Sequence, residues 1–163
     1  MNTIKVTPTT ASKIDSIDFK NLGFGTVFSD HMLVCDYKNG IWGTPEIVPF
    51  QPISLMPSAK IFHYGQSIFE GMKAYKDVDK KTWLFRPDEN FKRFNISAKR
   101  LSIPELPEAV FMEGLKALLK VDEQWIPTQD GSSLYIRPII FATGEGFHAS
   151  PADAYKFIIC TAP

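Results

Sequence analysis

Residues 87–120, PDENFKRFNISAKRLSIPELPEAVFMEGLKALLK, predict two amphipathic helices in direct succession. Pro87 suits the first position of a helix, and the acidic pair that follows it complements the positive end of the helix dipole. The apolar residues of the first helix recur at helical spacing: Phe91, Phe94, Ala98 and Leu101. Pro104 ends this helix, and the second begins after Pro107. Its apolar face is formed by Phe111, Leu115, Leu118 and Leu119.

On both sides of these helices the sequence predicts β-strands. The segments rich in β-branched and aromatic residues are 28–37, 41–50, 82–85, 134–142 and 155–161. Asn39-Gly40 is the strongest short hairpin signal and should join the first two of these strands. Pro45 and Pro49 make the return strand irregular, because proline cannot donate a hydrogen bond to a neighbouring strand.

The segment 63–75 carries a mixed signal. Ile68 and Met72 would share one stripe of a helix. Gly65 and Gly71 weaken that prediction, because each glycine costs a helix interior about 1 kcal/mol relative to alanine. We therefore expect a short helix here that leads into a strand near residues 73–76.

This order of elements predicts the α+β class, with a largely antiparallel sheet and two main helices packed on it. Residues 1–20 are polar and are expected to form an N-terminal arm, followed by a small domain over residues 21–163. An apolar strand at 157–160 with only three residues after it suggests a fragment of a longer protein. The alternative is a domain that ends on its last strand.

The composition excludes several classes of protein. The 163 residues carry 18 basic and 18 acidic side chains, and this balance argues against a general nucleic-acid binder. No apolar run approaches the roughly 18 residues of a membrane helix, and residues 1–18 lack both an apolar signal core and an Arg-rich transit pattern, so we expect no targeting segment there. Cys35 and Cys160 are too few for a disulfide framework or a four-ligand zinc site. We expect free thiols in a cytoplasmic protein without membrane contacts.

Two arginines are the most informative polar residues. Tyr135 and Arg137 should project from the same face of a strand, where a phenol and a guanidinium can bind a carboxylate together. The simpler interpretation is a solvated strand face. Arg93 follows Glu89 by four residues, which is typical of an exposed ion pair on a helix, and the functional alternative is an anion contact.

The other candidates are weaker. His31 and His63 could act as acid–base groups, but neither has a visible partner, so structural roles are favoured. Lys73 could be a nucleophile only if it were desolvated, and a solvated lysine is favoured. Gly144-Glu145-Gly146 is expected to be a loop. The metal-protease, P-loop and serine-hydrolase motifs are absent.

Four motifs together resemble the N-terminal domain of branched-chain amino acid aminotransferases, which are pyridoxal-phosphate enzymes of fold type IV. They are FGTVFSDHML at 24–33, FHYGQSIFEGMKAY at 62–75, LFRP at 84–87 and SLYIRP at 133–138. The resemblance implies exchange of the amino group between leucine, isoleucine or valine and 2-oxoglutarate. It also implies pyridoxal 5'-phosphate as cofactor, small amino and 2-oxo acids as ligands, and a homodimer.

The resemblance assigns roles residue by residue. Arg93 matches the arginine that binds the cofactor phosphate. Arg137 matches an arginine that meets the distal carboxylate of glutamate or 2-oxoglutarate. The residues that match the wall of the substrate side-chain pocket are Phe24, Tyr64, Phe69 and Tyr135. Phe147 and Ala149 match residues that reach into the neighbouring subunit's site.

One departure limits the prediction. In the family the cofactor lysine belongs to a C-terminal domain, which would follow residue 163, and Lys73 matches a different lysine. We therefore expect no catalytic residue in this chain, no bound cofactor and no activity of the chain alone. The alternatives are a D-amino acid aminotransferase, an aminodeoxychorismate lyase, or a cofactor-free interaction module that reuses this domain.

Overall fold

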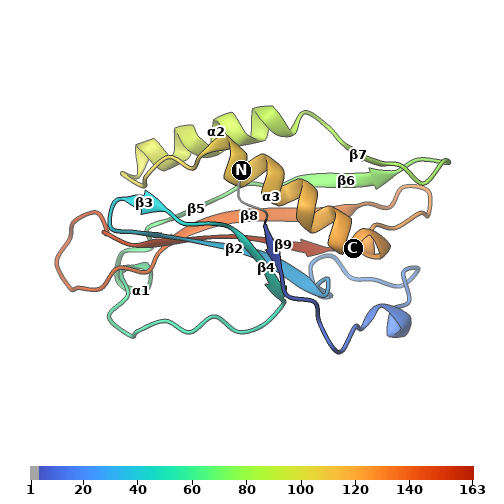
Figure 1. Ribbon diagram of the computed structural model, residues 1–163, viewed down its shortest axis with the longest axis horizontal. Helices are drawn as coiled ribbons and strands as arrows, with labels where there is room; N and C mark the ends of the chain where they lie inside the picture. Colours follow the sequence, from blue (N-terminus) through green and yellow to red (C-terminus); the bar gives the residue numbers. More distant parts are fainter. Residues whose placement is uncertain (1–3) are drawn as a thin grey trace.

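The computed structural model describes residues 4–163 and contains one mixed sheet with helices packed against it (Figure 1). The strands of the described residues are β1 (Lys5–Val6), β2 (His31–Lys38), β3 (Ile41–Trp42), β4 (Glu46–Pro49), β5 (Ser67–Phe69), β6 (Met72–Lys76), β7 (Thr82–Leu84), β8 (Leu134–Ala142) and β9 (Tyr155–Ala162). Their order is β1-β4-β2-β9-β8-β6-β7, with β3 paired to β2 and β5 paired to β8. Among these pairs only β1–β4 is parallel. The expected, largely antiparallel α+β architecture is confirmed.

The helices are α1 (Lys60–Tyr64), α2 (Pro87–Arg100) and α3 (Glu108–Val121), with 3-10 turns at Ile14–Ser16 and Glu123–Trp125. Helices α2 and α3 lie on the same side of the sheet, as Figure 1 shows. Pro87 begins α2 and Pro107 immediately precedes α3, so the proline signals placed both starts correctly. None of the described helices is long and apolar enough to cross a membrane.

The predicted hairpin is present, and its return strand is interrupted. Asn39 and Gly40 both adopt positive φ angles, 54° and 82°, which is the backbone of a tight two-residue turn. Strand β3 pairs with β2 for only two residues beyond that turn. Pairing with β2 resumes at β4, after the chain has passed Pro45.

The short helix expected in residues 63–75 is wrong in its position, whereas the strand expected near residues 73–76 is confirmed as β6. Helix α1 ends at Tyr64, because Gly65 adopts a left-handed conformation with φ of 61° and caps it. Ile68 and Met72 lie instead in β5 and β6, both of which pair with β8. Both side chains are buried, so their apolar character reflects strand faces rather than a helical stripe.

The core lies between the two helices and the sheet. Phe94 of α2, Phe111 of α3 and Phe157 of β9 are fully buried, with ring centroids 5.7–6.1 Å apart. Gly114 allows α3 to approach β2 closely, because a Cβ at this position would lie 2.6 Å from the Leu33 methyl group. Strand β8 pairs with β9 on one side and with β5 and β6 on the other, and the candidate site is built on this strand.

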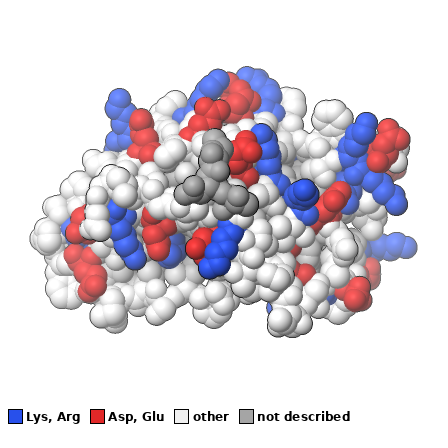
Figure 2. Space-filling view, viewed as in Figure 1, with Lys and Arg blue, Asp and Glu red and all other residues white. Residues whose placement is uncertain are grey.

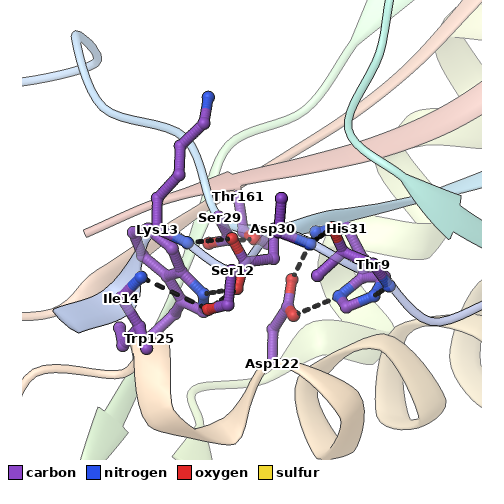
Figure 3. A network of polar contacts seen from close by, with 11 residues as sticks. Thr9, Ser12, Lys13, Ile14, Ser29, Asp30, His31, Asp122, Trp125 and Thr161 are labelled. Carbon is purple, nitrogen blue, oxygen red and sulfur yellow. Dashed lines mark hydrogen bonds and ion pairs between the residues drawn. The ribbon is translucent and has the colours of Figure 1, made fainter. Parts of the chain in front are cut away.

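A buried polar network holds the N-terminal segment against the domain (Figure 3). His31 Nδ1 lies 2.6 Å from Asp122 Oδ1, and the His31 backbone N–H donates to Asp122 Oδ2 at 3.0 Å. The Thr9 N–H donates to His31 Nε2 at 2.9 Å, so Nε2 is unprotonated and Nδ1 carries the proton. Asp30 accepts hydrogen bonds from Ser12 and Trp125 beside it. The structure therefore gives His31 a structural role, as favoured from the sequence.

Candidate carboxylate and phosphate site

Four predicted site residues meet on the exposed face of β8. Arg137 donates from Nη2 and Nε to the Tyr135 hydroxyl, at 2.9 and 3.2 Å. Its guanidinium carbon lies 4.4 Å from the centre of the Phe69 ring. The edge of Phe24 contacts the Tyr135 ring at a centroid distance of 5.1 Å. The spacing of two along the strand places Tyr135 and Arg137 together, as predicted.

The charge on Arg137 has no ion-pair partner among residues 4–163. A guanidinium has five N–H donors, and two of them bind the Tyr135 hydroxyl. The other three can donate hydrogen bonds to a carboxylate, while the aromatic rings beside Arg137 can contact an aliphatic chain. The cluster therefore combines a cation with an apolar surface.

Arg93 lies in a second arrangement, built around Glu70. Arg93 donates to this carboxylate from Nε at 2.5 Å and from Nη2 at 2.7 Å, and Asn90 adds a third bond at 2.9 Å. The Glu70 side chain is 6% exposed, whereas that of Arg93 is 66% exposed. The ion pair between Arg93 and Glu89 expected from the helix spacing is wrong, because Glu89 binds Lys92 instead. The Nη1 edge of Arg93 keeps its donors for an anion.

Sequence reasoning missed Glu70. This residue connects β5 to β6 and its backbone N–H donates to the Pro138 carbonyl of β8, so the sheet positions it. Burial alone would raise the pKa of Glu70, but hydrogen bonds from Arg93 and Asn90 and the charge of Arg93 hold the pKa below its usual value. The only feature of the sequence that pointed to Glu70 was its position as a single carboxylate between two apolar strand segments. That feature did not identify its partner.

Replacing Glu70 by Gln should therefore reduce stability in a pH-dependent way. The lowered pKa means that the folded state binds the Glu70 proton more weakly than the unfolded state does. The stabilisation that ionised Glu70 gives the folded state is complete above the ordinary glutamate pKa of 4.5. It is lost as the pH falls through the lowered pKa of the folded state. Urea unfolding of wild type and E70Q between pH 3 and 7 should show a difference in the free energy of unfolding that disappears on acidification. A difference that does not change with pH would contradict this assignment.

Gly71 connects the two arrangements. Its carbonyl accepts a weak bond of 3.4 Å from Asn90, and a Cβ at this position would overlap the Tyr135 hydroxyl. Asn90 and Tyr135 both border a hollow of about 320 Å³. The hollow is lined by Gly71, Met72, Lys73, Tyr75, Phe85, Asn90 and Tyr135. The absence of a side chain at Gly71 is what allows Tyr135 to occupy its present position.

Gly71→Ala is expected to displace Tyr135 and to destabilise the protein by about 1–3 kcal/mol, the usual cost of overpacking. Chemical denaturation measures this loss. The double variant Gly71→Ala/Tyr135→Phe should recover part of the lost stability, because the Tyr135 hydroxyl is the group with which the added methyl group would clash. Equal losses in the single and double variants would show that the hydroxyl is not the obstacle.

The remaining predicted residues lie on and opposite a loop. The Tyr64 hydroxyl of α1 donates to the Phe147 carbonyl, and His63 contacts the Phe147 ring edge-on at 5.0 Å. Phe147 is 75% exposed, and Ala149 follows it in the same exposed loop. The structure thus gathers Phe24, Phe69, Tyr135 and Arg137, pairs Tyr64 with Phe147, and places Arg93 with Glu70. The functional roles of all eight residues stay predictions.

The weaker candidates have structural environments. His63 Nε2 binds the Pro57 carbonyl at 2.8 Å, and Lys73 is exposed on β6. Cys35 and Cys160 are free, and burial raises the pKa of each thiol to about 11. Within residues 4–163 no group of three or more possible metal ligands is present. Charges of both signs are interspersed on the face shown in Figure 2.

Known proteins similar to this chain are branched-chain aminotransferases. The chain is 45% identical over 147 residues to branched-chain-amino-acid transaminase 1 of Bacillus subtilis, covering 90% of this chain and 41% of that protein. It is 44% identical over 158 residues to the branched-chain-amino-acid aminotransferase of Mycolicibacterium smegmatis, covering 96% and 43%. No protein-family model matches the chain. The chain spans about two-fifths of the length of these relatives.

Solved structures give the same result. The Escherichia coli branched-chain amino acid aminotransferase superimposes with a TM-score of 0.63 at 25% identity, over 82% of this chain and 40% of that chain. A second branched-chain amino acid aminotransferase, from T.th. and complexed with N-(5'-phosphopyridoxyl)-L-glutamate, gives a TM-score of 0.55 at 29% identity, over 78% and 39%. The similarity covers most of this chain and less than half of each enzyme.

Proposed function

We propose, from the premise that this chain belongs to the branched-chain-amino-acid aminotransferase family, that it forms the first part of a transaminase. The longer protein would exchange the amino group between leucine, isoleucine or valine and 2-oxoglutarate. Relatives of 44–45% identity along nearly the whole chain support this choice over the other fold type IV enzymes and over an interaction module. Because the chain spans two-fifths of those relatives, the activity of the whole protein is our proposal.

The observation that carries this proposal is the environment of Arg137. Its guanidinium lies on the Phe69 ring, is held by the Tyr135 hydroxyl and has no ion-pair partner among the described residues. A transaminase of this kind must accept an aliphatic side chain and a distal carboxylate in the same pocket. An apolar wall discriminates single methylenes by only about 1–3 kcal/mol, so one pocket can accept all three aliphatic amino acids. Arg137 would bind the carboxylate of the other substrate.

The proposed cofactor is pyridoxal 5'-phosphate, and Arg93 would bind its phosphate. The exposed Nη1 edge of Arg93 suits a phosphate oxygen, while Glu70 fixes the orientation of the guanidinium. When bound, this cofactor accepts the electron pair of the substrate α-carbon and so allows its proton to be moved. Tyr64, Phe24, Phe147 and Ala149 would shape the pocket. The lysine that moves the proton would come from outside the 163 residues.

The remaining parts of the proposal concern assembly and location. We propose a cytoplasmic homodimer in which Phe147 and Ala149 of one protomer border the site of its partner. Residues 21–163 would form the small domain, and residues 1–20 would form an arm. Residues 1–3 lie outside the described residues, and the hydrogen bond from Thr9 to His31 connects the described part of the arm to the domain.

The direct test compares the 163-residue chain with a longer protein that contains it. The longer protein, loaded with pyridoxal phosphate, should convert leucine and 2-oxoglutarate into glutamate and 4-methyl-2-oxopentanoate. The short chain should not, and borohydride reduction in the presence of pyridoxal phosphate should give only scattered, substoichiometric lysine adducts by mass spectrometry. A longer protein that fails to transaminate leucine would refute the function. A single stoichiometric adduct on the short chain would refute its predicted inactivity.

A further inference from the structure

The loop at residues 144–152, which carries Phe147 and Ala149, is fastened to the segment around α1. The backbone contributes two bonds: Lys60 N–H to the Gly144 carbonyl at 2.9 Å and Gly146 N–H to the Ser58 carbonyl at 3.0 Å. Side chains add bonds at either end of the loop. The Ser58 hydroxyl donates to the Glu145 carboxylate, and the Ala152 N–H donates to Gln66 Oε1 at 3.1 Å.

Lys60 lies at the centre of this contact and is 3% exposed. Its ammonium donates to the Ser150 hydroxyl at 2.7 Å, to the Ser150 carbonyl at 3.1 Å and to the Pro151 carbonyl at 3.4 Å. An ammonium has three N–H donors, and all three are used. The Ser150 hydroxyl donates its own proton to the Pro151 carbonyl at 3.3 Å.

All three acceptors are neutral, and they belong to two consecutive residues of one loop. Among residues 4–163, no carboxylate lies within 4.0 Å of the Lys60 ammonium. Burying a charge is costly unless hydrogen bonds compensate it, and here the loop supplies all of them. Movement of residues 150 and 151 away from α1 would break all of these hydrogen bonds of the ammonium. The loop is therefore held in one position by a cost that an uncharged side chain would not impose.

We propose that Lys60 is a positioning residue that fixes the 144–152 loop and thereby limits the size of the substrate side chain that the pocket accepts. The proposal rests on the proposed function, in which Phe147 and Ala149 border the pocket. Lys60 does not touch the substrate. It acts through the place of the loop, which the Tyr64 hydroxyl supports from the other side by its bond to the Phe147 carbonyl.

The first measurement is amide hydrogen exchange on the 163-residue chain. Lys60→Met introduces an unbranched side chain one heavy atom shorter and without charge, and the matched control Lys99→Met changes an exposed lysine of α2. In K60M the amides of Gly146 and Ala152 should exchange about 10-fold faster, while those of β8 and β9 stay protected. In K99M none should change. Unchanged exchange in the loop of K60M would overturn the proposal.

Ser150→Ala keeps the proposal testable if K60M does not fold. Ser150 is exposed, and the substitution removes one of the three acceptors of Lys60 without creating a buried charge or a cavity. Faster exchange of the Ala152 amide is expected, while the amides of β8 and β9 stay as protected as in wild type. A loop as protected as in wild type would again overturn the proposal.

The second measurement is substrate selectivity in the longer transaminase. A loosened loop should discriminate less, so the ratio of kcat/KM for leucine and valine should move toward unity by about 3–10-fold in K60M. A loop that exchanges faster with an unchanged ratio would overturn the role in specificity and leave the proposed function intact. A wild-type protein without transamination would instead overturn the proposed function, and with it the role in specificity, while hydrogen exchange would still decide whether Lys60 holds the loop.

Discussion

In the longer protein that we propose to be a transaminase, replacing Arg137 by Met is expected to lower kcat/KM for 2-oxoglutarate by about 10²–10³-fold, the range for truncating one partner of a buried charge pair. In the wild type the Arg137 guanidinium would bind the distal carboxylate of 2-oxoglutarate. Met at this position leaves that carboxylate without a partner. With 4-methyl-2-oxopentanoate the loss should stay within about 3-fold, because its aliphatic chain contacts the apolar wall, which Met preserves. Steady-state kinetics with the two 2-oxo acids measure the difference.

Two control variants separate binding from packing. Arg137→Lys keeps the charge without the bidentate geometry and should give an intermediate loss for 2-oxoglutarate. Tyr135→Phe removes the hydroxyl that accepts hydrogen bonds from Nε and Nη2 of Arg137. Arg137 then keeps its charge but loses the group that orients it. If Arg137→Met reduced the rates with both 2-oxo acids equally, Arg137 would be a structural residue of β8 rather than a carboxylate ligand.

Replacing Asp122 by Ala should lower the free energy of unfolding by about 2–6 kcal/mol, because two buried N–H donors of His31 lose the carboxylate that accepts from them. The Asp122 side chain is 3% exposed and accepts both the backbone and the ring N–H of His31. Without it, two buried donors lose their acceptor, each at about 1–3 kcal/mol. Urea denaturation followed by circular dichroism measures the change.

The effect should also reach the N-terminal segment. His31 Nε2 accepts the Thr9 N–H only while Nδ1 holds the proton that Asp122 binds, so loss of Asp122 should accelerate exchange of the Thr9 amide (Figure 3). Asp79→Ala is the matched control, since Asp79 is exposed in the turn before β7 and should change stability by less than about 0.5 kcal/mol. A loss below about 1 kcal/mol in Asp122→Ala would contradict the importance of this network.

Local sequence determined most of the elements. Pro87 and Pro107 mark the helix starts, and Asn39-Gly40 marks the hairpin, because these preferences act within a few residues of the chain. Strand β8 was located from its β-type composition alone. Alternation along that strand also placed Tyr135 and Arg137 on one face. Local signals misplaced the helix in residues 63–75, where a left-handed glycine and pairing with β8 outweighed an apparent helical stripe, although the strand expected near residues 73–76 is present.

Partners distant in sequence were decided only by the tertiary structure. Arg93 has Glu89 within reach on its own helix, yet it binds Glu70, because the sheet places that carboxylate in a buried position where both oxygens accept. Lys60 is one of 18 basic residues in the sequence, and only the packing of α1 against the 144–152 loop shows it to be buried. Periodicity records which face of an element is apolar. The partner of a charge depends on strand register and helix placement, which arise only when distant segments pack together.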